Sequence, residues 1–541
     1  MLGNKHKVLA IGGAAAVIAS LAACGSSTSS TGSGPGTADV KGQPVVLGTT
    51  ETVTSLDPAG SYDLGSWTLQ YSMFQTLLTI PAGQNTPQGD AAKSCSYQDP
   101  KTFTCTLKPG LKFSNGDPLT SKDVKWSLER NIKIADPNGA SGLLASIANK
   151  DSQGNLTVNP KAIDTPNPTT VVFHLSHPDT TFQFVLTTPA SDIVDHKVYP
   201  FDKKMSGTTV VGSGPYELSK YQAGQQASFV PNPNYTGANK AQAPQFLVQY
   251  YQESSALKLA VQNGEVDIAW RSLSPQDVNN LKSDSKVTVA QGAGSEIRYW
   301  VWKVDGPVGK NLAVRQAAAY LINRDEIAKT AYDGTVVPLY SIVPPGFPGQ
   351  TDAFKAIYGA TPNKTKAAQV LKAAGIKTPV QLTIGYTPSH YGPNAVDEAT
   401  QVQRQLNSSG LFNVQIKSAE WTQYQTLYKQ NAYDMYILGW FPDFLDADNY
   451  LAPFLVDGGF YANGYTNAQA NKLVADEEGT SNAARRQSDF EQLQKIAARD
   501  VPFIPSWVGK NTAVYGPGVK GVEGTLDPSF IFRFWKISKG A

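Results

Sequence analysis

The chain has 541 residues, of which 41% are hydrophobic, 10% aromatic and 17% charged. This apolar content supports folded cores and excludes disorder over most of the length, which predicts two to four domains at about 100–200 residues each. The formal net charge is only +2, so the chain has no global positive field, and we expect no nucleic-acid partner.

The first segment in chain order is an export signal. Two lysines precede an apolar stretch, residues 8–19, which leads into Leu-Ala-Ala-Cys. This pattern predicts a signal peptide at 1–23, too short for a stop-transfer helix. Cys24 resembles the acylated cysteine of a bacterial lipobox, and 24–42 predicts a flexible, lipid-anchored tether. We therefore expect an exported protein held by its lipid at the outer face of the cytoplasmic membrane; ordinary secretion is the alternative.

Two further cysteines, Cys95 and Cys105, lie close together in the chain. An exported protein meets oxidising conditions, and an even pair at this spacing can close a short loop. Asp99-Pro100 supplies a turn signal between them. The pattern predicts a disulfide, and two free buried thiols are the alternative.

The chain then alternates between strand and helix patterns. Strands are expected at 45–50, 103–107, 171–175, 246–251 and 266–270, and helices at 71–78, 256–262, 313–332 and 365–374. Thr120 and Asp123 form a capping-box pattern that predicts the start of another helix.

The clearest pattern covers residues 380–440, where strands 380–386, 414–418 and 434–440 alternate with helices 394–406 and 422–430. This alternation predicts a right-handed, mostly parallel sheet, and ligands of such sheets bind beyond the carboxyl ends of the strands. The last strand runs into Gly439-Trp440-Phe441-Pro442-Asp443. These residues offer close backbone approach, an aromatic wall and a charge; a turn with a core tryptophan is the alternative.

Common catalytic motifs are missing from the sequence. It has no Gly-x-Ser-x-Gly elbow, no His-Glu-x-x-His, no Walker loop and no Gly-x-Gly-x-x-Gly after a strand. His174 and His177 have no further ligand at metal spacing. Asp443, Asp446 and Asp448 lack the glycine and terminal glutamate of a helix–loop–helix calcium site. We expect no enzymatic activity, no metal and no cofactor.

Several ordered motifs agree with one family. They are SLDPA at 55–59, LKPGLKFSNGDPLT at 107–120, VGSGPY at 211–216, NPNY at 232–235, NGEVDI at 263–268, VRQA at 314–317, Gly439-Trp440 with Asp443, and DVPFIP at 500–505. Over roughly residues 45–537 the chain resembles the family 5 extracellular solute-binding proteins, the oligopeptide, dipeptide and nickel receptors of ABC importers.

The resemblance implies a two-lobed α/β fold of the periplasmic-binding-protein type (cluster C) with an extra inserted subdomain and a ligand cleft between the lobes. Lobe I would comprise 43–75, 208–298 and 506–541, the inserted subdomain 76–207, and lobe II 299–505. It also implies a monomer that closes on its ligand by a hinge motion and delivers it to permease subunits.

Ligand contacts also follow from the resemblance. Asp443 matches the carboxylate that peptide-binding members offer to a ligand's ammonium. The other matching positions are Gly439, Trp440 and Phe441 beside it, Trp421 as a pocket wall, and Thr52, Val53 and Thr54 as an opposing strand. Dipeptide binders carry an arginine shortly after Pro-Asn-Ala, whereas Ala395 is followed here by Val396-Asp397.

This departure favours an oligopeptide over a strict dipeptide as the ligand. A cationic small molecule, a sugar or a metal chelate remain alternatives. Two further classes are a secreted hydrolase, which would need an activated nucleophile or an acid–base pair, and a surface structural protein, which would need repeats.

Overall fold

The computed structural model describes residues 41–388, 390–392, 394–461 and 463–540. The predicted signal peptide, Cys24 and the tether up to residue 40 lie outside the described residues. None of the helices in the described part combines the length and hydropathy that a membrane-spanning helix needs.

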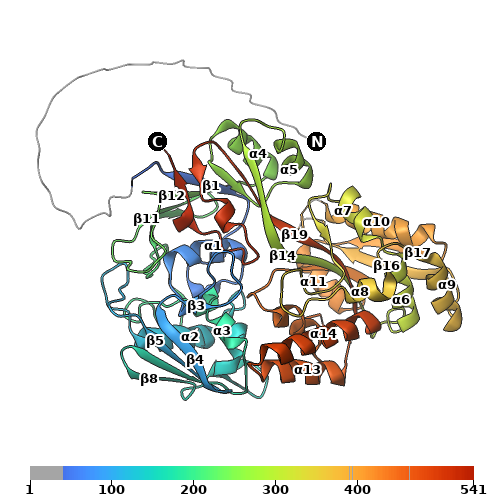
Figure 1. Cartoon of the computed structure of the whole chain (residues 1–541), viewed down its shortest axis with the longest axis horizontal. Helices are drawn as coiled ribbons and strands as arrows, with labels where there is room; N and C mark the ends of the chain where they lie inside the picture. The colour runs from blue at the N-terminus through green and yellow to red at the C-terminus, as the bar shows by residue number, and fades with distance from the viewer. Residues whose placement is uncertain (1–40, 389, 393, 462, 541) are drawn as a thin grey trace, which may run out of the picture. The chain divides into compact units, whose positions relative to one another are not determined.

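An eleven-stranded sheet organises the fold, in the order β10-β11-β12-β1-β13-β19-β14-β18-β16-β17, with β15 beside β19 (Figure 1). Its strands are β1 (Val45–Thr49), β10 (Tyr216–Gln222), β11 (Gln226–Pro231), β12 (Phe246–Tyr250), β13 (Ile268–Trp270), β14 (Thr288–Trp302), β15 (Val337–Pro338), β16 (Val380–Tyr386), β17 (Phe412–Ser418), β18 (Met435–Trp440) and β19 (Phe503–Tyr515).

The two long strands β14 and β19 join the two halves of this sheet. They pair antiparallel from Thr288–Tyr515 to Val301–Phe503, and the register shifts between Arg298 and Tyr299. The lobe boundaries expected at 298/299 and 505/506 fall at this shift. The irregularity supports a change of chain direction there, and the division into lobes remains a prediction.

On one side of the long strands, β1 pairs parallel with both β12 and β13. Helix α4 (Ser254–Asn263) connects β12 to β13 and ends at Gly264, whose φ of +74° a glycine adopts without strain. The strand–helix–strand prediction for 246–270 is confirmed. Helices α1 (Leu64–Met73) and α5 (Pro275–Leu281) complete this half.

A separate antiparallel sheet has the order β4-β5-β9-β8. Its strands are β4 (Ala92–Asp99), β5 (Thr102–Leu107), β8 (Ile163–Asn167) and β9 (Thr170–His174), and α2 (Ser121–Ile134) packs on it. Cys95 lies opposite Cys105 across β4 and β5, and the two form the predicted disulfide. Helix α2 begins with the predicted capping box of Thr120 and Asp123.

On the other side of the long strands, β16 pairs parallel with both β17 and β18, as predicted. Helices α10 (Ala395–Ser408) and α11 (Trp421–Lys429) connect these strands. The remaining helices of this half are α6 (Leu312–Leu321), α7 (Arg324–Thr330), α8 (Ala353–Tyr358), α9 (Lys364–Ala373), α12 (Ala452–Leu455), α13 (Ala468–Glu478) and α14 (Ala483–Asp500).

The short elements lie outside these layers. They are η1 (Pro58–Gly60), η2 (Ser141–Ile147), α3 (Phe182–Val185), η3 (Pro189–Ser191), η4 (Ala447–Tyr450), η5 (Glu523–Thr525), η6 (Phe534–Lys536), β2 (Leu78–Thr79), β3 (Gln88–Gly89), β6 (Ala148–Lys150), β7 (Leu156–Val158), β20 (Val519–Lys520) and β21 (Ser538–Lys539).

Two predicted helices are wrong in extent. The helix expected at 71–78 is α1, which begins at Leu64 because the Asp63 side chain accepts a hydrogen bond from the Ser66 backbone N–H. The helix expected at 313–332 is two helices, α6 and α7. The break comes at Asn323, whose side chain caps the second helix by accepting from the Glu326 backbone N–H.

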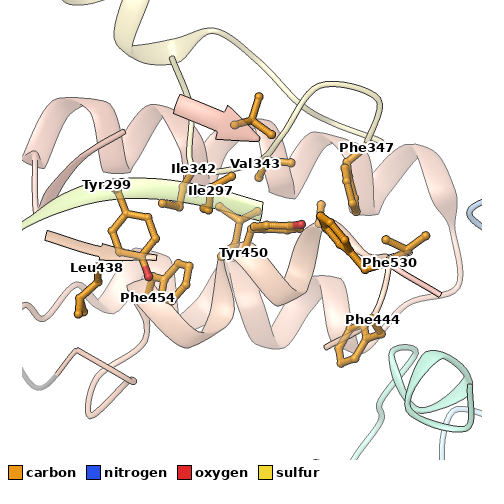
Figure 2. Packing of buried hydrophobic residues seen from close by; sticks show 14 of the residues in the cluster. Ile297, Tyr299, Ile342, Val343, Phe347, Leu438, Phe444, Tyr450, Phe454 and Phe530 are labelled. Atoms are coloured by element: carbon orange, nitrogen blue, oxygen red, sulfur yellow. The ribbon is translucent and has the colours of Figure 1, made fainter. Parts of the chain in front are cut away.

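A buried aromatic cluster supports the middle of the sheet. Ile297 and Tyr299 of β14 point into it, and Tyr299 packs on Phe454 with ring centroids 5.5 Å apart (Figure 2). Phe347 and Tyr450 meet edge-to-face at 5.2 Å in the same cluster. Because side chains alternate along a strand, residues 296 and 298 of β14 face away from this core.

Candidate ligand-binding site

The predicted binding segment lies where β18 ends. Gly439 is paired with Arg298 of the neighbouring β14. A Cβ atom at Gly439 would lie 2.2 Å from Nη1 of Arg298, so only glycine leaves room for this guanidinium. The close approach predicted for Gly439 is therefore an approach of a side chain of the protein itself, which occupies the face of the strand.

Arg298 is the centre of the arrangement. Its side chain is only 4% exposed and forms an ion pair with Glu296, with Nη2 2.6 Å from Oε1. The guanidinium lies 4.3 Å from the ring centroid of Tyr391 and 5.0 Å from that of Trp507. Such cation–π contacts strengthen when the cation is desolvated. The arginine is thus held between two aromatic faces and one carboxylate.

Trp421, the predicted pocket wall, joins the same group through aromatic rings. It begins α11 and stacks on His390 with centroids 3.7 Å apart and ring planes 6° from parallel. Tyr391 meets Trp421 edge-to-face at 5.6 Å. Burial, assisted by the charge of Arg298, lowers the pKa of His390 to about 4. His390 is therefore neutral near pH 7 and acts as an aromatic surface.

Phe441 connects the binding segment to the other half of the sheet. The guanidinium of Arg271, which follows β13, lies 4.5 Å from the Phe441 ring and 5.0 Å from that of Phe530. Arg271 also lies within ion-pair distance of Glu51 (3.4 Å) and Glu296 (3.8 Å). Glu296 therefore stands between two arginines, and the pair of carboxylates and pair of guanidiniums form a compact charged group.

Asp443 makes its contacts with neutral groups. Its Oδ1 accepts a hydrogen bond from the Tyr62 hydroxyl (2.5 Å), and its Oδ2 accepts from Asn449 Nδ2 (3.0 Å). Asn449 Oδ1 in turn accepts from the Asp443 backbone N–H and from Trp440 Nε1. Burial raises the pKa of Asp443, against these two hydrogen bonds. Trp440 and Asp443 are thus positioned by one asparagine.

Thr52, Val53 and Thr54 are not a strand, so that prediction is wrong: residues 50–55 form an extended segment without sheet partners. The backbone N–H of Thr54 donates instead to Ser66 Oγ at 2.9 Å. Val53 and Thr54 contribute to a cavity of about 320 Å³ whose lining contains no residue of lobe II as predicted. Its lining residues are Val53–Asp57, Tyr199, Lys204, Met205, Gly207, Thr209, Tyr221 and Ala223.

The structure thus brings Trp421, Gly439 and Phe441 to the Arg271–Arg298 group, and it places Trp440 and Asp443 beside Asn449. Sequence reasoning missed both arginines and their carboxylates. A signal was present: Glu-Ile-Arg at 296–298 places two charges, one on each side of Ile297, at the start of an apolar and aromatic run. Tyr62 had no such signal.

Comparison with known proteins gives a consistent family. The family model of bacterial extracellular solute-binding proteins, family 5 (middle), matches residues 86–462. The chain is 29% identical over 476 residues to the probable D,D-dipeptide-binding periplasmic protein DdpA of Escherichia coli, covering 85% of this chain and 87% of that protein. It is 25% identical over 542 residues to the oligopeptide-binding protein OppA of Bacillus subtilis, covering 95% and 97%.

Two solved structures share the fold. The ABC transporter substrate-binding protein CtaP of Listeria monocytogenes has a TM-score of 0.79 at 22% identity and covers 92% of this chain and 100% of that one. The periplasmic binding protein DppA of Helicobacter pylori, in complex with the peptide STSA, has a TM-score of 0.76 at 22% identity, covering 92% and 98%. The predicted two-lobed α/β fold is confirmed. Since the family model spans more than half of its residues, the chain belongs to the bacterial extracellular solute-binding proteins of family 5.

Proposed function

We propose that the protein is the substrate-binding component of an ABC importer, and that it captures a peptide by closing its lobes and delivers it to permease subunits. The names of DdpA and OppA, which refer to dipeptides and oligopeptides, support a peptide as the ligand. Closure of two lobes around a ligand is a hinge motion that the ligand's contacts to both sides stabilise. A binding role without catalysis agrees with the absence of a nucleophile motif from the sequence.

The observation that carries this proposal is the environment of Asp443. Its carboxylate is partly buried and has only neutral donors; within the described ranges no lysine or arginine forms an ion pair with it. A carboxylate removed from water is most stable beside a cation. The N-terminal ammonium of a peptide would provide this cation, and Tyr62, on the opposite side, would close over it.

The charged and aromatic groups nearby suit the remainder of a peptide. Arg271 Nη1 and Arg298 Nε are buried and have no hydrogen-bond acceptor among the described residues. They can donate to carbonyl or carboxylate oxygens of an extended ligand. The backbone that follows β18 would pair with the ligand as an added strand. Without the arginine of dipeptide binders after Ala395, the site favours oligopeptides.

The finer localisation is part of the same proposal. Cys24 would carry the lipid, residues 24–42 would form the tether, and the monomeric body would stand at the outer face of the cytoplasmic membrane. A diacylated cysteine anchors a protein stably, whereas one acyl chain binds only reversibly.

Asp443→Asn tests the proposal because it keeps the shape of the side chain and removes its charge. Calorimetric titration with a peptide identified by mass spectrometry of the purified protein should show about a hundredfold weaker binding, or about 2.8 kcal/mol. Asp434→Asn, at the opposite end of the same strand, is the matched control and should bind as wild type. N-acetylated peptide should bind wild type weakly and discriminate little between wild type and Asp443→Asn.

The pH dependence has a definite sign. Burial raises the pKa of Asp443 in the free protein, and an adjacent ammonium favours the ionised form. Affinity should therefore be full above this raised pKa and fall as the pH drops through it, but not in Asp443→Asn. If free and acetylated peptides bind wild type equally, recognition by the amine is wrong and a sugar becomes the better ligand. If peptides are recovered cleaved, the protein is a hydrolase.

A further inference from the structure

A group of acidic side chains lies apart from the peptide site. Asp448 of η4 and Glu477 and Glu478 at the end of α13 each bring one carboxylate oxygen within 4.8 Å of the others. Asp448 is 6% exposed and Glu477 is fully buried. We refer to these three residues as the acidic cluster. The possible calcium loop considered from the sequence, Asp443-Asp446-Asp448, does not form, because Asp443 and Asp446 have other partners.

Arg486 neutralises only part of the negative charge. Its Nη1 and Nη2 each lie 2.9 Å from an oxygen of Asp446. Its Nε and Nη2 also donate to Oε2 of Glu477, at 3.0 and 2.7 Å. Asp448 and Glu478 form no ion pair with a lysine or arginine in the part of the chain that the structure describes. One arginine thus faces four carboxyl groups.

The carboxylate oxygens that point into the cluster have no donors. Asp448 Oδ1 and Glu477 Oε1 are both buried, and neither has a hydrogen-bond partner among the described residues. Burial and the neighbouring carboxylates raise the pKa of Glu477, Glu478 and Asp448. An unpaired oxygen in such a place costs free energy unless a proton or a cation occupies the space between the carboxylates.

The spacing is that of ligands around a calcium ion. Ca²⁺ binds carboxylate oxygens at about 2.3–2.6 Å, so two oxygens on opposite sides of the ion are about 4.6–5.2 Å apart. Oxygens within 4.8 Å of one another fit on one such sphere. Mg²⁺ prefers about 2.0–2.1 Å and retains its waters more strongly. We infer that Asp448, Glu477 and Glu478 bind a calcium ion, with water completing the coordination.

The ion would connect two parts of the chain that already touch here. The backbone N–H of Thr180, which lies between β9 and α3, donates to the Glu478 carbonyl at 2.9 Å. Phe184 of α3 stacks on Phe444 with centroids 6.0 Å apart. Phe444 directly follows Asp443, and Asp448 lies one helical turn further on. Calcium would therefore stabilise both this junction and the segment that contains Asp443.

Calcium binding can be tested without a peptide. The full protein, stripped with a chelator, is titrated with CaCl₂ and with MgCl₂ up to 10 mM at constant ionic strength, by calorimetry and by thermal unfolding. We expect one Ca²⁺ per chain, with a dissociation constant on the order of 10⁻⁴–10⁻³ M as in other extracellular modules, and weaker binding of Mg²⁺. Tb³⁺ should bind in competition with Ca²⁺ and be sensitised by nearby aromatic rings.

Variants separate a calcium site from a proton-sharing cluster. Asp448→Asn and Glu478→Gln should each weaken calcium binding at least tenfold, and Asp448→Asn should raise the melting temperature of the calcium-free protein by reducing repulsion. Asp476→Asn, on the same helix but outside the cluster, should bind calcium as wild type. If Asp448→Asn does not fold, Glu478→Gln, at a half-exposed position, carries the test.

The inference is overturned if wild type shows no saturable calcium binding by 10 mM. It is also overturned if the variants bind calcium as wild type does, or if stability rises on acidification while calcium has no effect, since a proton then occupies the cluster.

Discussion

Replacing Glu398 should destabilise the protein more than any other single change on α10. The side chain is fully buried and accepts hydrogen bonds from four groups. Trp300 Nε1 (3.1 Å) and the Ser506 hydroxyl (2.6 Å) donate to Oε1. The Tyr332 hydroxyl and Trp507 Nε1, both at 2.8 Å, donate to Oε2. One carboxyl group therefore ties α10 to β14, β19 and the segment after α7.

The magnitude follows from what the donors lose. Each buried donor left unsatisfied costs about 1–3 kcal/mol. The hydroxyls of Ser506 and Tyr332 can rotate toward other acceptors, whereas the indole N–H groups of Trp300 and Trp507 are fixed by ring packing. Two orphaned indoles and a cavity predict a loss of about 3–5 kcal/mol in the free energy of unfolding for Glu398→Ala. Such a loss is a large share of the about 5–15 kcal/mol typical of proteins.

Glu398→Gln should fall between wild type and Glu398→Ala, because it keeps one acceptor oxygen and turns an amide group toward two donors. Urea unfolding followed by tryptophan fluorescence measures all three, and the m-values should stay equal. Asp397→Asn, the exposed neighbour on the same helix, should change the midpoint by no more than about 0.5 kcal/mol. A Glu398→Ala protein as stable as Asp397→Asn would refute this account of the hydrogen bonds.

Other expected outcomes concern the binding segment, the disulfide and the anchor. Gly439→Ala should lower the unfolding free energy by about 1–3 kcal/mol and weaken ligand binding, because the new methyl group displaces the buried Arg298; unchanged urea midpoints would contradict this. Replacing Cys95 and Cys105 together by serine should cost about 2–3 kcal/mol of stability and leave ligand affinity intact, and equal melting temperatures would argue against it. Cys24→Ser should move the protein from the membrane fraction to the soluble fraction, and continued sedimentation with membranes would exclude the lipid anchor.

Local patterns in the sequence determined much of this protein. The strand and helix alternation at 380–440 predicted a parallel arrangement that β16, β17 and β18 adopt. The capping box at Thr120 and the pairing of Cys95 with Cys105 were also predictable. Each of these features depends on residues that are near in the chain, where periodicity, capping and loop closure act directly.

Tertiary structure decided the contacts of the site. Tyr62 reaches Asp443 across 381 positions of sequence, and no periodicity records such a contact. Arg298 lies against Gly439 only because β14 pairs with β18 in one register, and a slip by one residue would turn the arginine to the opposite face of the sheet. The long helix expected at 313–332 divides at Asn323 because a local cap outweighs continuous helical periodicity. Side-chain neighbours that depend on strand register and on packing between distant segments could not be derived from the order of residues, since that order specifies local conformation more directly than distant pairing.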